Sequence, residues 1–129
     1  MKMPTSTAEP TQPPTPVSGY FEGERMELTW RYAYQPEFVP LLMDYLGVRP
    51  GMRILDVGCG SGFLSRTLAR TLDDVQVVGL DVDEKLLDLA HQMLGREGLI
   101  DRVELRQGNA YQIPYPDETF DLVTSQTLL

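Results

Sequence analysis

The chain has 129 residues, of which 19 are acidic and 11 are basic, so its formal net charge is −8. This length suffices for one domain with its own core. The acidic balance disfavours a nucleic-acid substrate, because surfaces that bind phosphates are basic. A single cysteine, Cys59, excludes an internal disulfide and a multi-cysteine metal site in this segment, and it fits a reducing, cytoplasmic setting. No apolar stretch approaches the length of a membrane span.

The first part of the chain divides into a tail and a helical segment. Residues 1–18 are rich in Pro and Thr, and we expect them to be disordered. Residues 19–48 are expected to be helical and to pack on the sheet of the domain formed by residues 49–129. The apolar residues at helical spacing, which precede a stop at Gly47, are Phe38, Leu41, Leu42, Tyr45 and Leu46. Two interpretations of the aromatic residues Trp30, Tyr32 and Tyr34 stay open. In the first they form a lid over a binding site, and Arg31 pairs with a carboxylate of the ligand. In the second their side chains only pack an N-terminal helix against the domain.

Residues 49–129 alternate apolar runs with helical patterns. The predicted strands are residues 53–57, 75–80, 103–106 and a fourth that begins near residue 120. A helix over residues 61–71 is expected to turn Arg66 and Arg70 outward. Asp83 is expected to cap a second helix that ends near Gly95 and buries Leu86, Leu87, Ala90, Met93 and Leu94. This alternation predicts an α/β fold with a doubly wound, mainly parallel sheet in three layers. Because the fourth run reaches Leu129 without a turn or cap, we expect the domain to be incomplete after that strand.

A glycine-dense turn joins the first predicted strand to the first helix. The segment Asp56-Val57-Gly58-Cys59-Gly60-Ser61-Gly62 has the spacing D-x-G-x-G-x-G. Glycines allow a sharp turn and let a ligand lie against the backbone. The dinucleotide fingerprint has the different spacing G-x-G-x-x-G. An acid before the first glycine would repel phosphates and suits a ligand with an ammonium group, which indicates S-adenosylmethionine.

Two further motifs follow in order. Asp81 ends the second strand about 20 residues beyond the turn, where an acid can accept from both hydroxyls of a ribose. The third strand leads into Gly108-Asn109-Ala110, and Phe120-Asp121-Leu122-Val123 opens the fourth. Over roughly residues 50–129 the chain resembles the class I S-adenosylmethionine-dependent methyltransferases, in particular the small-molecule branch that includes quinone-biosynthesis C-methyltransferases.

The resemblance implies a Rossmann-like fold and transfer of a methyl group to an O, N or C atom of a small molecule. Two alternatives remain at this stage, an NAD(P)-dependent oxidoreductase and a cofactor-binding module without catalysis. Neither a catalytic residue nor a metal ligand is identified. The implied cofactor-binding residues are Asp56, Gly58, Cys59, Gly60, Gly62, Asp81, Val82, Asn109, Ala110 and Gln126.

The roles that the resemblance implies have structural alternatives. Asp56 would hold the methionine ammonium directly or through water, or would only fix the turn. Val82 would offer an apolar edge to the adenine, and Ala110 its backbone amide. Asn109 stands where an aspartate is usual; its carbonyl can accept from the adenine amino group, and its amide can donate to a ring nitrogen. Gln126 would reach the methionine portion or merely end a strand, and Cys59 is expected to be a small residue packed under the cofactor.

Overall fold

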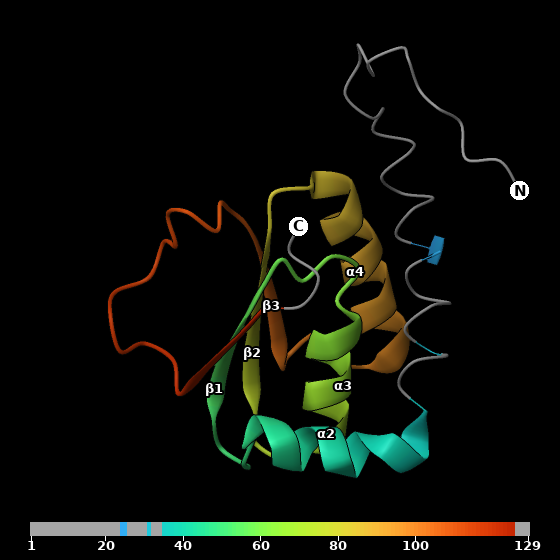
Figure 1. Cartoon of the computed structure of the whole chain (residues 1–129). Coiled ribbons are helices and arrows are strands. Elements are labelled where there is room, and N and C mark those ends of the chain that lie inside the picture. Colours follow the sequence, from blue (N-terminus) through green and yellow to red (C-terminus); the bar gives the residue numbers. More distant parts are fainter. Residues whose placement is uncertain (1–23, 26–30, 32–34, 126–129) are drawn as a thin grey trace, which may run out of the picture.

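A four-stranded parallel sheet organises the domain. The computed structural model describes residues 24, 25, 31 and 35–125. The strands lie in the order β3-β2-β1-β4, and every neighbouring pair is parallel (Figure 1). Their bounds are β1 (Arg53–Val57), β2 (Gln76–Asp81), β3 (Val103–Gln107) and β4 (Leu122–Ser125). The predicted Rossmann-like α/β fold is confirmed.

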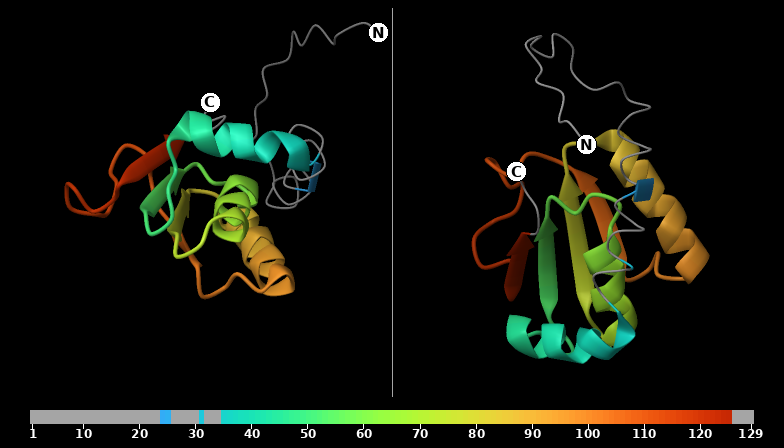
Figure 2. Two further views of the ribbon diagram at one scale, coloured as in Figure 1. Left: turned by 90° about the horizontal axis from the view of Figure 1, so that it is seen from below. Right: turned by 45° about the vertical axis from the view of Figure 1, so that its right-hand side comes forward.

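The helices of the described residues lie on one face of the sheet (Figures 1 and 2). They are α2 (Val39–Leu46), which follows the 3-10 turn η1 (Pro36–Phe38), α3 (Phe63–Thr71) and α4 (Glu84–Glu97). Their apolar side chains meet those of the strands in one buried cluster, which includes Ile54, Leu68, Val77, Leu94 and Val103. Burial of this apolar surface is the main favourable contribution to folding.

The opposite face of the sheet is covered by a loop in the described part of the chain. Residues 108–121 place three side chains, Ala110, Tyr115 and Phe120, against a second apolar cluster formed by Leu55, Val57, Val78 and Leu80. Tyr115 and Phe120 meet edge to face, with ring centroids 5.1 Å apart. The loop therefore takes the position on this face that a helix would take in a complete third layer.

The C-terminal end of this loop is hydrogen-bonded to the first residue of β1. The Asp121 backbone N–H donates to the Arg53 carbonyl, and the Arg53 N–H donates to Asp121 Oδ2, both at 2.8 Å. The Arg53 guanidinium also lies over the Phe120 ring at 5.5 Å. Asp121 is thus the strand-entry residue that the sequence predicted.

Two expectations about side-chain direction are wrong. Arg66 was expected to face outward but is 3% exposed; its guanidinium lies over the Phe63 ring and pairs with Glu97 of α4. A long arginine stem can follow the helix surface to a distant acid, which local periodicity does not show. In α2, Met43 is buried, whereas Leu41 and Tyr45 are exposed.

The predicted ends of the helices are close to the observed ones. Gly47 ends α2 in the left-handed conformation, with φ of 71°, as expected. Asp83 caps α4, accepting from the backbone N–H groups of Lys85 and Leu86. The stop predicted at Gly95 is wrong, because α4 continues to Glu97 and ends at Gly98, whose φ is 68°. Leu89, which was not predicted, is buried in this helix, while Leu86 and Met93 are half-buried.

Several predictions concern residues outside the described ones. They include the disordered tail of residues 1–18 and the lid residues Trp30, Tyr32 and Tyr34. Arg31 is described and is exposed. Within the ranges that the structure describes, no helix combines the length and apolar character needed to cross a bilayer.

Candidate cofactor site

The glycine turn lies at the carboxyl end of β1 and is tied to β2. Gly58, Gly60 and Gly62 have φ values of 71°, 57° and 84°, a region that favours glycine. The backbone N–H groups of Gly58 and Cys59 both donate to the Leu80 carbonyl, at 2.7 and 3.0 Å. These bonds hold the turn against the end of the neighbouring strand.

The Asp81 side chain is also hydrogen-bonded to the glycine turn. Its Oδ2 accepts from the Gly60 N–H at 2.9 Å, and its Oδ1 accepts from the Asp83 N–H at 2.9 Å. A carboxylate has about four lone-pair positions, so both oxygens keep capacity for further donors. Asp81 is therefore placed to accept from a ligand and to hold the glycine turn at the same time.

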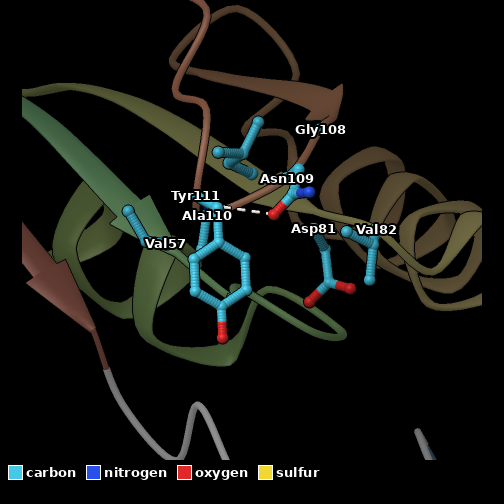
Figure 3. Close-up of a pocket in the computed structure, with 9 residues that line it drawn as sticks. Val57, Asp81, Val82, Gly108, Asn109, Ala110 and Tyr111 are labelled. Atoms are coloured by element: carbon cyan, nitrogen blue, oxygen red, sulfur yellow. Dashed lines mark hydrogen bonds between the residues drawn. The ribbon is translucent and has the colours of Figure 1, made fainter.

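A pocket of about 460 Å³ opens beside Asp81 (Figure 3). Its size is within the range of small-molecule sites, and its mixture of apolar walls with a few polar groups is typical of them. The lining residues are Val57, Gly58, Leu80, Asp81, Val82, Gly108, Asn109, Ala110 and Tyr111. The structure thus brings together five of the predicted site residues, namely Gly58, Asp81, Val82, Asn109 and Ala110.

Tyr111 is a pocket residue that the sequence analysis missed. Its side chain is 97% exposed, and its backbone N–H donates to Asn109 Oδ1 at 2.9 Å. The adjacent Gln112 N–H donates to the Asn109 carbonyl at 3.0 Å. Asn109 therefore shapes a tight turn that carries Tyr111 to the pocket, and the only sequence signal is an aromatic residue directly after the third-strand motif.

Asp56 lies apart from the pocket lining. It is 2% exposed, its Oδ2 accepts from the Ser65 hydroxyl at 2.7 Å, and the Thr124 hydroxyl lies 3.4 Å from its Oδ1. Burial raises the pKa of this carboxyl to about 6, although the two hydroxyls oppose the shift. The contacts favour the interpretation that Asp56 fixes the turn, with the Ser65 and Thr124 hydroxyls and the Ser65 backbone amide as its donors.

The other predicted site residues lie behind or outside the pocket. Cys59 is buried, which raises the pKa of its thiol, and a Cβ added at Gly79 would come within 3.0 Å of its Sγ. The prediction that Cys59 packs under the cofactor stays a prediction. Gly60 and Gly62 are buried in the turn and do not line the pocket. Gln126 lies outside the described residues.

The pocket lies beside a glycine turn at the carboxyl edge of a parallel sheet, which is where folds of this class bind nucleotide-type cofactors. Residues 54–129 match the family model described as "Methyltransferase domain". The chain therefore belongs to the methyltransferase-domain family, and its resemblance to the class I S-adenosylmethionine-dependent methyltransferases is confirmed.

Curated relatives agree with this assignment. The chain is 37% identical over 83 residues to the ubiquinone/menaquinone biosynthesis C-methyltransferase UbiE of Vibrio parahaemolyticus, covering 64% of this chain and 32% of that protein. It is 37% identical over 82 residues to a sterol 24-C-methyltransferase of Gibberella zeae, covering 64% of this chain and 21% of the relative. The chain spans about a third or less of these curated relatives.

A solved structure shows the same fold over most of the chain. It is a candidate S-adenosyl-L-methionine-dependent methyltransferase of Methanococcus maripaludis, with a TM-score of 0.78 and 24% identity. The superposition covers 94% of this chain and 54% of that one. Since the relatives are named as methyltransferases, the oxidoreductase alternative gains no support.

Proposed function

We propose that the chain binds S-adenosylmethionine at the carboxyl ends of β1, β2 and β3 and takes part in methyl transfer to a small molecule. The observation that carries this proposal is the position of Asp81. Its carboxylate lines the pocket and also accepts from the Gly60 N–H, so one side chain joins the pocket to the glycine turn. That arrangement suits a ligand with a ribose between a base and an amino-acid portion.

Each part of the cofactor has matching residues. Asp81 would accept from the ribose hydroxyls, and Val82, which is 63% exposed, would offer an apolar edge to the base. Asn109 and the Ala110 backbone amide would contact the base edge. The backbone at Gly58 and Gly60 leaves room for the amino-acid portion, because neither glycine carries a Cβ. Gly62 is the N-cap residue of α3, and Cys59 is buried in the same turn.

Asp56 is assigned an electrostatic role. Its carboxylate is buried between the Ser65 and Thr124 hydroxyls, so it would attract the ammonium of the ligand from beneath the turn, directly or through water. Charges interact strongly where water is excluded. A bound ammonium would in turn favour the ionised form of Asp56.

Positioning is the contribution that we assign to the protein in the reaction. When bound, S-adenosylmethionine supplies a methyl group already activated by a sulfonium. Alignment of the reacting groups can contribute about 7 to 11 kcal/mol to lowering the barrier. We assign no general base to this chain, and Gln126 stays a predicted contact of the methionine portion.

A small apolar molecule with a carbon acceptor is the proposed substrate class. Both curated relatives are named as C-methyltransferases, of a quinone and of a sterol, which supports carbon among the O, N and C alternatives. The net charge of −8 supports a substrate other than nucleic acid. The buried, unpaired thiol of Cys59 is compatible with the cytoplasmic setting that we propose.

Calorimetric titration of the 129-residue chain with S-adenosylmethionine and with NAD tests the cofactor. We expect binding of S-adenosylmethionine and at least about tenfold weaker binding of NAD, because NAD brings a pyrophosphate close to Asp56 and Asp81. Tighter binding of NAD would support the oxidoreductase alternative. Binding of neither ligand would contradict a cofactor site in this chain.

A further inference from the structure

Asn109 presents its carboxamide to the pocket in a fixed orientation. Its Oδ1 accepts from the Tyr111 backbone N–H at 2.9 Å (Figure 3). The nitrogen of a carboxamide cannot accept that bond, so the oxygen faces Tyr111. The Nδ2 group then lies on the side of Val82, as Figure 3 shows.

The opposite orientation is disfavoured by the turn itself. A rotated carboxamide would bring the Nδ2 donor against the Tyr111 donor and would break the bond that closes the turn. The backbone carbonyl of Asn109 also accepts from the Gln112 N–H at 3.0 Å. The backbone that carries the side chain is therefore fixed by a hydrogen bond of its own. The group that Asn109 directs to the Val82 side of the pocket is therefore a hydrogen-bond donor, whereas its oxygen is directed at Tyr111 (Figure 3).

A donor at this position selects different atoms of a purine than an acceptor does. Adenine carries an exocyclic amino group, which donates, and ring nitrogens, which accept. We propose that Asn109 makes this pocket recognise the base through a ring nitrogen and leaves the exocyclic amino group without a strong partner. This inference rests on the proposed S-adenosylmethionine site and concerns its specificity.

The substitution Asn109→Asp isolates this effect. Aspartate supports the same kind of turn, because one of its oxygens can accept from the Tyr111 N–H. Its second oxygen would replace the Nδ2 donor with a charged acceptor, which suits the amino group of adenine. The matched control is Gln112→Glu, which adds the same charge in the same turn, at an exposed residue that does not line the pocket.

Calorimetric titration with S-adenosylhomocysteine and with its analogue that carries hydrogen in place of the exocyclic amino group tests the proposal. The parent chain and Gln112→Glu are expected to bind the two ligands within about threefold of each other, because both ligands keep the ring nitrogens. Asn109→Asp is expected to bind S-adenosylhomocysteine at least about tenfold more tightly than the analogue, since it gains one charge-assisted bond.

Three outcomes would overturn the inference. The first is a parent chain that binds S-adenosylhomocysteine at least tenfold more tightly than the analogue, which would show that Asn109 or another group already accepts from the amino group. This comparison requires no variant. An unchanged ratio in a folded Asn109→Asp variant would show that the residue does not face the base. Failure of the parent chain to bind S-adenosylhomocysteine would overturn the proposed function as well, which separates the two failures.

Discussion

Asp56 is the last residue but one of β1 and Asp81 is the last residue of the neighbouring β2, yet their surroundings are opposite. Asp56 is 2% exposed between two hydroxyl groups, whereas Asp81 lines the open pocket and accepts from two backbone amides. Strand alternation places Asp56 on the same face as Ile54, which the helices cover. Asp81 extends one residue beyond Leu80, the last β2 residue paired with β1. The two acids therefore differ in their surroundings: Asp56 is buried beneath the turn, and Asp81 lines the pocket.

The largest expected effect is the loss of cofactor affinity in Asp81→Ala. This change removes two charge-assisted bonds to the ribose, each worth roughly 1.5 to 3 kcal/mol, or about a hundredfold or more in affinity together. It also releases the Gly60 N–H from its acceptor. Titration of the variant with S-adenosylhomocysteine measures the loss. Parent-like affinity would show that Asp81 is only a turn residue.

Asp56→Asn should instead change how stability depends on pH. The pKa of Asp56 is raised from 3.8 to about 6, so its contribution to stability is present below pH 4 and is lost as the pH rises to about 6. The asparagine variant lacks this loss. Its stability relative to the parent should rise by about 3 kcal/mol between these pH values and then stay level.

Urea unfolding of both proteins from pH 3.5 to 8 gives this difference, and the contributions of all other carboxyl groups cancel in the subtraction. A difference that is independent of pH would mean that Asp56 ionises as freely as an exposed acid.

A glycine pair tests whether the backbone beside the pocket is packed more tightly than the exposed surface of α4. A Cβ added at Gly108 would lie 2.6 Å from Leu80 Cδ1, and Leu80 is 1% exposed, so Gly108→Ala should destabilise the fold by about 1 to 3 kcal/mol. Gly95, in α4, has nothing within 4 Å of an added Cβ. Gly95→Ala should therefore stabilise the helix by up to about 1 kcal/mol. Equal effects in urea unfolding would contradict this difference in packing.

The smallest effect is expected for Asp83→Ala, at the acid next to the site. Asp83 Oδ1 accepts from the Lys85 N–H at 2.9 Å and caps α4. Its loss should cost about 1 kcal/mol of stability with cofactor affinity little changed. The melting temperature and the affinity for S-adenosylhomocysteine, measured together, check both parts. Weak cofactor binding in this variant beside normal binding in Asp81→Ala would mean that the ribose acid was assigned to the wrong residue.

The sequence predicted the sheet and the pocket because their signals are local. Apolar runs located the starts of the four strands to within two residues, and Gly58 of the glycine turn and Asp81 both line the pocket. The surroundings of Asp56 could not be predicted in this way, because one of its partners, Thr124, is 68 residues away in the chain. The orientation of Asn109 depends on a turn whose closing bond appears only in the folded backbone.

The crystal structure of the chain with bound S-adenosylhomocysteine is the most direct test of the proposed site. We expect the ribose hydroxyls within hydrogen-bond distance of the Asp81 carboxylate, the base beside Val82 and Asn109, and the amino-acid portion over Gly58 and Gly60. Asp56 should keep its bond to the Ser65 hydroxyl beneath the turn. A ligand bound elsewhere on the chain, or a ribose turned away from Asp81, would contradict the account.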